Sequence, residues 1–145
     1  MPSHYESFWN ARSFAVVGHS ARARFPVITY QALKKTGRIV YPVDSDGRTI
    51  EGVRAYPDLA SLPEPVEAVV IEVPKDETRV WVERAARAGI KEVWIHMMRD
   101  TPEAVALANE RGLNLRTGTC AAMYVTPGLS YHCAHKWIQQ IRGRY

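Results

Sequence analysis

Residues 13–35 read SFAVVGHSARARFPVITYQALKK, a short apolar run that ends in a glycine, followed by a polar loop and a helical pattern. Pro26 suits the first turn of the predicted helix, which runs to about Lys35, because the N–H that proline lacks would have no partner there. Gly37 follows as a stop signal, and residues 38–43 (RIVYPV) return to strand-type side chains. This stretch therefore predicts a strand, a loop, a helix and a second strand.

The same alternation continues along the chain. We expect a short edge strand at 51–56 and further strands at 67–73 (EAVVIEV), 92–96 (EVWIH) and 114–116. One helical turn is expected at 57–62. Longer helices are expected at about 76–88, capped by Asp76, and at 101–111. The run at 67–73 is rich in β-branched residues, as in strands that are buried on both faces of a parallel sheet. Alternating strands and helices imply right-handed crossovers. The predicted fold class is α/β, a doubly wound parallel sheet that is Rossmann-like and forms a single domain.

Length and composition set the broad class. With 145 residues, 46% hydrophobic and 23% charged, residues 1–145 fit one domain, with a basic helical tail at about 128–145. The chain lacks an apolar run of the roughly 20 residues that a membrane span needs, and residues 1–12 resemble neither a signal nor a transit peptide. Two cysteines are too few for a disulfide framework. These features predict a cytoplasmic protein with no membrane partner.

The predicted ligand site lies beyond the carboxyl ends of the strands, where the strand order reverses. If the order is 3-2-1-4-5-6, the loops after the first and fourth strands flank that point. Gly18 allows a phosphate to approach the backbone, the N–H groups of His19 and Ser20 can face it, and Arg22 and Arg24 add positive charge. The net charge of +4 also permits an anionic ligand, and the basic tail lacks a recognised nucleic-acid module, which makes nucleic acid an unlikely partner.

Two enzyme alternatives remain open on the residues alone. An NAD(P)-binding enzyme is weakened because Ser20 and Ala23 replace the second and third glycines of G-x-G-x-x-G, although Asp44 ends the second strand near the place of a ribose-binding acid. A Cys-dependent enzyme or a zinc site would need Cys120 to converge with His19 and His96. We interpret Cys120 as a small apolar core residue. A regulatory or partner-binding subunit is a third hypothesis, suggested by the tail.

A family resemblance is carried by several segments together. They are AVVGHS (15–20), VYPVD (40–44), AYPDLASLPEPVEAVVIEVP (55–74), AGIKEVWIH (88–96) and RGLNLRTGTC (111–120). In this order and spacing, the chain resembles the small stand-alone CoA-binding proteins, which are similar to the N-terminal CoA-binding domain of the succinyl-CoA synthetase α subunit. The resemblance covers roughly residues 14–120.

This resemblance implies non-catalytic binding of coenzyme A or a short acyl-CoA, with a protein partner or a homo-oligomer as further possibilities. It also assigns a role to each matching position. The CoA phosphates would be held by Gly18, His19 and Ser20 with charge from Arg22 or Arg24, the adenine or ribose would be lined by Val43 and Asp44, and the pantetheine would contact Val73 and Pro74.

The chain departs from the family pattern in two loops. Asp44-Ser45-Asp46 stands where the family often has Asn-Pro-Lys, which removes a cation and places acids near a polyanion. Met97-Met98-Arg99 stands where the family often has a glycine, which closes the pocket or supplies Arg99 instead.

Overall fold

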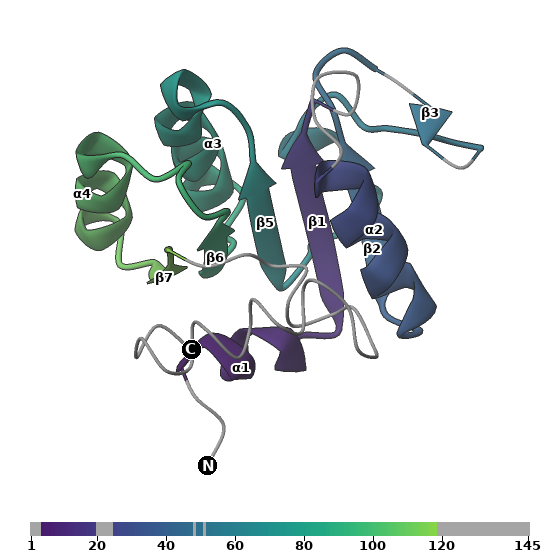
Figure 1. Ribbon diagram of the computed structural model, residues 1–145, viewed down its shortest axis with the longest axis horizontal. Coiled ribbons are helices and arrows are strands. Elements are labelled where there is room, and N and C mark those ends of the chain that lie inside the picture. The colour runs from purple at the N-terminus through teal and green to yellow at the C-terminus, as the bar shows by residue number, and fades with distance from the viewer. Residues whose placement is uncertain (1–3, 20–24, 48, 51, 119–145) are drawn as a thin grey trace.

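The computed structural model describes residues 4–19, 25–47, 49–50 and 52–118. Five parallel strands form the central sheet in the order β2-β1-β5-β6-β7. Their bounds are Ser13–Gly18 (β1), Ile39–Val43 (β2), Ala68–Glu72 (β5), Glu92–Ile95 (β6) and Asn114–Arg116 (β7). The crossover helices are α2 (Phe25–Lys35), α3 (Lys75–Arg87) and α4 (Pro102–Glu110). Figure 1 shows α2 lying across β1 and β2, and α3 beside α4 toward the other end of the sheet. The predicted α/β class is confirmed.

Each face of the sheet has its own hydrophobic core, because alternate residues of a strand point to opposite faces. On one face, Val17 and Ile71 pack with Trp81 of α3 and Leu107 of α4. The other core joins residues of the N-terminal third of the chain with residues of β5 and β6: Phe8, Trp9, Phe14, Val16, Tyr30, Leu33, Val70 and Trp94. Helices therefore cover both faces, as a doubly wound sheet requires.

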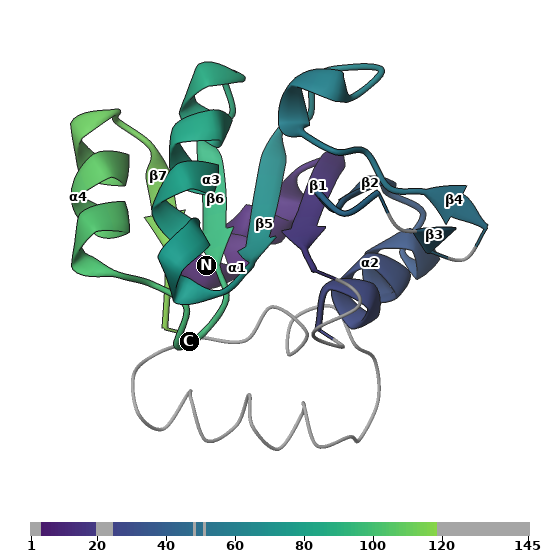
Figure 2. The same cartoon turned by 90° about the horizontal axis from the view of Figure 1, so that it is seen from above.

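The prediction of an edge strand at 51–56 is wrong for most of these residues. A two-stranded antiparallel ribbon forms instead from β3 (Thr49–Ile50) and β4 (Val53–Arg54), with Gly52 in the left-handed conformation at its turn. Figure 2 shows this ribbon projecting beyond β2, at the opposite end of the molecule from α4. Among the described residues 52–56, only Tyr56 joins the parallel sheet, through a single bridge to Val43. Local pairing satisfies the backbone of the ribbon, and Pro57, which has no N–H, ends the contact with β2.

The helix ends also refine the sequence interpretation. Pro74 occupies the N-cap of α3 without a side-chain bond, so Asp76 lies in the first turn and is not the cap. In α4, Thr101 is the N-cap, since its Oγ1 accepts the Ala104 N–H at 3.1 Å. The turn predicted at 57–62 is a short 3-10 helix, η2 (Leu59–Ser61), which Asp58 caps.

An N-terminal segment that the sequence did not reveal completes the second core. It comprises α1 (His4–Ser7) and the 3-10 helix η1 (Phe8–Asn10). Phe8 and Trp9 are buried, and their ring centroids lie 5.3 and 4.9 Å from that of Trp94. This segment has too few residues for a helical pattern, so only its long-range contacts explain its conformation.

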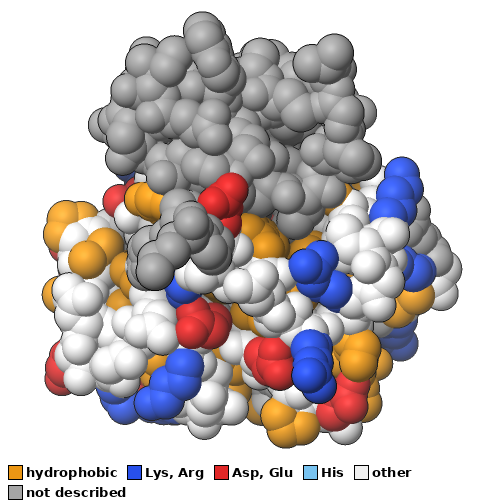
Figure 3. All heavy atoms as spheres, turned by 90° about the horizontal axis from the view of Figure 1, so that it is seen from below, with side chains coloured by type: hydrophobic (Ala, Val, Ile, Leu, Met, Phe, Trp, Pro, Cys, Tyr) orange, Lys and Arg blue, Asp and Glu red, His pale blue; other side chains and the backbone are white. Residues whose placement is uncertain are grey.

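Charge is mixed over the surface that Figure 3 shows, where blue and red side chains are interspersed on the described part of that face. Within the part of the chain that the structure describes, every helix is too short or too polar to cross a membrane. The predicted tail at 128–145 lies outside the described residues.

Candidate ligand-binding crevice

The predicted site residues that the structure describes gather at the carboxyl edge of the sheet. Gly18 pairs in register with Glu72, and beyond it the His96 N–H donates to the Ile71 carbonyl at 3.0 Å. His19 and Asp44 follow directly after β1 and β2 at the same edge. Ser20, Arg22 and Arg24 lie outside the described residues.

Three predicted contact residues have a strong packing role. Val43 and Val73 are 1% exposed and belong to the core cluster that α3 covers. Pro74 is half-buried at the start of α3. The two valine side chains are therefore core residues, and Pro74 is the more accessible of the three.

The backbone of Gly18 lies so close to α2 that no residue with a side chain would fit there without a shift. A Cβ atom at Gly18 would be 2.2 Å from Pro26 Cγ and 2.9 Å from the Glu72 carbonyl oxygen. Gly18 does not have a positive φ, so backbone conformation alone does not require glycine there. The absence of a side chain instead lets the beginning of α2 pack directly against the end of β1.

His19 lies among three carboxylates. Its Nε2 is 2.8 Å from both carboxylate oxygens of Glu77, and its Nδ1 is 3.3 Å from Asp46 Oδ2 and 3.9 Å from Asp44 Oδ1. His19 is 6% exposed and Asp44 1%. Burial disfavours the imidazolium ion, but the hydrogen bonds and charges of Glu77 and Asp46 outweigh it and raise the pKa of His19.

A second buried pair, Glu72 and His96, lies at the same edge. His96 Nδ1 is 3.4 Å from Glu72 Oε2, and the side chains of both residues are at least nine-tenths buried. Both carboxylate oxygens of Glu72 are buried. Burial raises the pKa of Glu72 to about 7, while the Thr29 hydroxyl and the positive charge of Arg99 lower it by smaller amounts.

The loop after β6 adds a hollow beside His96. Residues 96–99 line a cavity of about 390 Å³. Met98 is 74% exposed and has a φ of 62°, the left-handed conformation that glycine adopts without strain. The Thr78 hydroxyl donates to the Arg99 carbonyl at 2.7 Å and attaches the loop to α3.

The suggested convergence of Cys120 with the two histidines cannot be followed, because Cys120 lies outside the described residues. Each histidine instead has its own carboxylate neighbours. The sequence interpretation placed His19 and Asp44 at the crevice but missed Glu77 and the Glu72–His96 pair. Glu72 did carry a signal, since it is a charged residue within an otherwise apolar strand.

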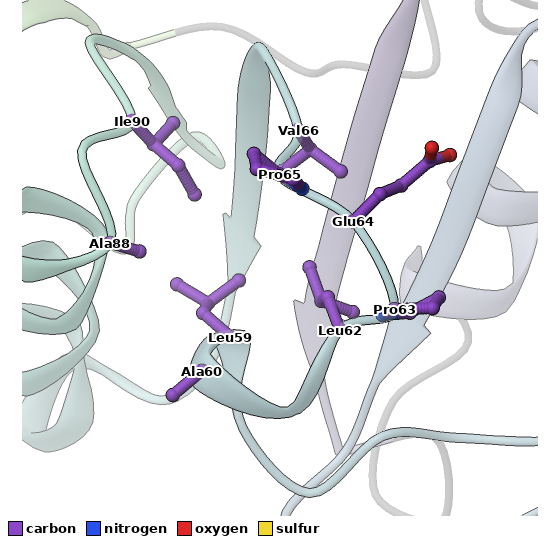
Figure 4. Close-up of a pocket in the computed structure, with 9 residues that line it drawn as sticks. All are labelled: Leu59, Ala60, Leu62, Pro63, Glu64, Pro65, Val66, Ala88 and Ile90. Carbon is purple, nitrogen blue, oxygen red and sulfur yellow. The ribbon is translucent and has the colours of Figure 1, made fainter.

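Another hollow, of about 250 Å³, lies at the amino edge of the sheet (Figure 4). Leu59, Leu62, Val66 and Ile90 line it with apolar side chains, and the Glu64 carboxylate points away from it in Figure 4. Its loops lead into β5 and β6, whereas the ligand crevice of an open parallel sheet lies at the carboxyl ends. We therefore interpret it as a packing hollow.

Several known proteins are similar to this chain in sequence or in fold. A family model described as a CoA binding domain matches residues 12–126. The chain is 26% identical over 133 residues to the α subunit of an ADP-forming acetate–CoA ligase II from Pyrococcus furiosus. That alignment covers 82% of this chain but only 29% of the ligase subunit.

Two solved structures share the fold over most of both chains. A hypothetical protein from Pyrococcus horikoshii OT3 has 28% sequence identity and a TM-score of 0.73, and the match covers 83% of this chain and 86% of the other. A conserved hypothetical protein from Pyrococcus furiosus has 28% identity and a TM-score of 0.69, with 77% and 97% covered.

Proposed function

The chain belongs to the family of CoA-binding domains, and from this premise we propose that it binds coenzyme A or a short acyl-CoA at the carboxyl edge of its sheet, without transforming it. The family match carries the proposal, because it includes the loops after β1, β2, β5 and β6. The close approach of α2 to Gly18 supports it, since the start of a helix favours a phosphate group.

The proposed contacts are those that the resemblance implies. Backbone groups of Gly18, His19 and Ser20 would bind the phosphates, with Arg22 and Arg24 supplying positive charge. Val43 and Asp44 would lie at the adenine or ribose side, and Val73 and Pro74 beside the pantetheine. The ligase relative is named as a subunit, so a protein partner or a second copy of this chain is also proposed, and the mass in solution with and without CoA tests this.

Coenzyme A is expected to raise the melting temperature more than NAD at equal concentration. A ligand at one hundred times its Kd stabilises the native state by about 2.7 kcal/mol, which shifts the melting temperature of a domain of this size by several degrees. Differential scanning fluorimetry with CoA, acetyl-CoA, NAD, NADP and ATP measures the shifts. A larger shift with NAD or NADP would replace this proposal with the dinucleotide alternative, and no shift with any of them would remove both.

Changing both Arg22 and Arg24 to Gln is expected to weaken CoA binding at least tenfold, because one charge-assisted hydrogen bond contributes about 1.5–3 kcal/mol. The salt dependence of the remaining binding should flatten, since fewer charges are paired. Calorimetric titration at low and high salt measures both effects. Arg87→Gln with Arg111→Gln is the matched control, because both arginines pair with Glu83 on the exposed surface. Equal effects of the two double variants would show that Arg22 and Arg24 act only through net charge.

A further inference from the structure

The cluster around His19 has the donor groups and the spacing of a metal site. The donor atoms are His19 Nδ1 and one carboxylate oxygen each from Asp44 and Asp46, and they lie within 4.8 Å of one another. We propose that these three residues bind a divalent transition-metal ion such as Zn²⁺, with Glu77 orienting the imidazole. The site does not depend on the proposed function, because its ligands are all side chains of this protein.

The distances suit a small ion. Zinc binds nitrogen and oxygen ligands at about 2.0–2.2 Å, which places neighbouring ligand atoms of a tetrahedron about 3.4 Å apart. The Nδ1 atom of His19 is 3.3 Å from Asp46 Oδ2 and 3.9 Å from Asp44 Oδ1. Small side-chain adjustments would bring all three atoms to one ion.

Glu77 orients the imidazole of His19, as a carboxylate that is hydrogen-bonded to a metal-binding histidine does. With a proton on Nε2, His19 donates to both oxygens of Glu77 at 2.8 Å. The lone pair of Nδ1 then faces the two aspartates. Metal-bound histidines commonly donate their other ring N–H to a carboxylate in this way, which sets the tautomer and the ring orientation.

Burial distinguishes this cluster from a group of solvated surface acids. The side chains of His19 and Asp44 are 7% and 1% exposed, whereas Asp46 is 44% exposed. Two ligands are therefore preorganised inside the protein, and the third lies at the open side, where water or another oxygen ligand can complete the coordination. One imidazole and two carboxylates favour Zn²⁺, Co²⁺ or Mn²⁺ over Ca²⁺ and Mg²⁺, which prefer oxygen ligands alone.

The location also explains how an acidic loop can accept a polyanion, a step that rests on the proposed function. Asp44, Asp46 and Glu77 put negative charge beside the loop proposed for the CoA phosphates. A divalent ion offsets much of that charge and offers its open coordination position to a phosphate oxygen. The departure from the family pattern at Asp44-Ser45-Asp46 thereby supplies two of the three protein ligands of the ion.

To test the site, the full chain is treated with a chelator and then titrated with Zn²⁺ in a calorimeter, in the absence of CoA. We expect tight binding of Zn²⁺ and weak binding of Mg²⁺. Asp46→Asn and His19→Gln should each lower the Zn²⁺ affinity at least tenfold. Asp46 is partly exposed, so its variant is expected to fold normally. The control is Asp76→Asn, an exposed acid in the same first turn of α3 as Glu77, and it should leave zinc binding unchanged.

Spectroscopy distinguishes the proposed site from metal binding by residues elsewhere in the chain. Co²⁺ at the proposed site has only nitrogen and oxygen ligands, so its absorption spectrum should lack the thiolate charge-transfer band that Cys120 or Cys133 would produce. Zinc affinity that is the same in the native chain, Asp46→Asn and His19→Gln would overturn the proposal. No zinc binding to the native chain would do the same.

The role of Glu77 is tested by two substitutions. Glu77→Ala should weaken Zn²⁺ binding about 10- to 100-fold, as is typical when a residue that hydrogen-bonds a metal ligand is removed. Glu77→Gln should restore part of that loss, because its amide oxygen can still accept the Nε2 hydrogen. Equal zinc affinity in all three proteins would contradict a positioning role.

Titration of CoA with EDTA present and with Zn²⁺ present tests the phosphate step. The metal is expected to raise CoA affinity several-fold in the native chain and not in Asp46→Asn. Zinc binding without any CoA binding would refute the proposed function and leave the metal site intact. CoA binding without zinc binding would refute the metal site and leave the proposed function intact.

Discussion

Replacing Gly18 with alanine is expected to lower the free energy of unfolding by about 3 kcal/mol or more. The new Cβ would lie 2.2 Å from Pro26 Cγ and 2.9 Å from the Glu72 carbonyl oxygen. Overpacking typically costs about 1–3 kcal/mol, and neither neighbour here can retreat easily, because one is a proline ring and the other is strand backbone. Urea unfolding measures the loss, and α2 would have to shift away from β1 for the variant to fold.

A second glycine provides the control. Gly112 has a φ of +69°, and a Cβ there would meet nothing within 4 Å. Gly112→Ala should therefore cost only the conformational strain, about 1–2 kcal/mol. A double-mutant cycle with Pro26→Ala, which removes the proline Cγ atom at the closest contact, should recover part of the Gly18→Ala loss. If Gly18→Ala proved milder than Gly112→Ala, the close approach of α2 to β1 could not be correct.

The inner strands β1 and β5 were predictable because they are buried along their whole length. Their apolar, β-branched runs are independent of what lies beside them, so β1 has the predicted bounds and β5 lies within its predicted run. A glycine closely follows each of the three crossover helices. Gly37, Gly89 and Gly112 all adopt the positive φ that ends a helix.

Other parts of the fold depend on long-range contacts that a local pattern does not contain. The segment at 51–56 has strand-type residues, but whether it joins β2 or pairs with its neighbour is decided by the turn at Gly52. Phe8 and Trp9 precede β1 in the sequence yet pack against Trp94 of β6. Composition alone could not show that these rings complete a core.

The candidate site was predictable only where the sheet topology fixes it. Gly18, His19 and Asp44 follow strands, so a parallel sheet must bring them to one edge. Glu77 belongs to a helix, and its approach to His19 depends on how α3 packs. The pairing of Glu72 with His96 depends on the register of β5 and β6, which places Ile71 opposite Ile95 and the next residues side by side.

Replacing Glu72 with glutamine is expected to change the free energy of unfolding differently at the two ends of a pH range. The change at pH 8 should be more stabilising than the change at pH 4.5 by about 3 kcal/mol. The pKa of Glu72 is raised from 4.5 in the unfolded chain to about 7 in the fold, chiefly by burial. Between these pH values the native carboxyl retains a proton that the unfolded chain has released. The stability of the native protein therefore falls as the pH rises through this window, at up to about 1.4 kcal/mol per pH unit, and stays lower above it.

Glutamine keeps the shape of the neutral carboxyl and cannot ionise, so the variant should lose this slope. Denaturant unfolding from pH 4.5 to 8, taken as the difference between variant and native protein, cancels the other titrating groups. His96 and Arg99 face Glu72 and are the charges that could oppose the effect. Should Glu72→Gln be destabilised at pH 8, Glu72 would have to be ionised in the fold and paired with one of these cations, and the crevice would hold a buried ion pair beside Gly18.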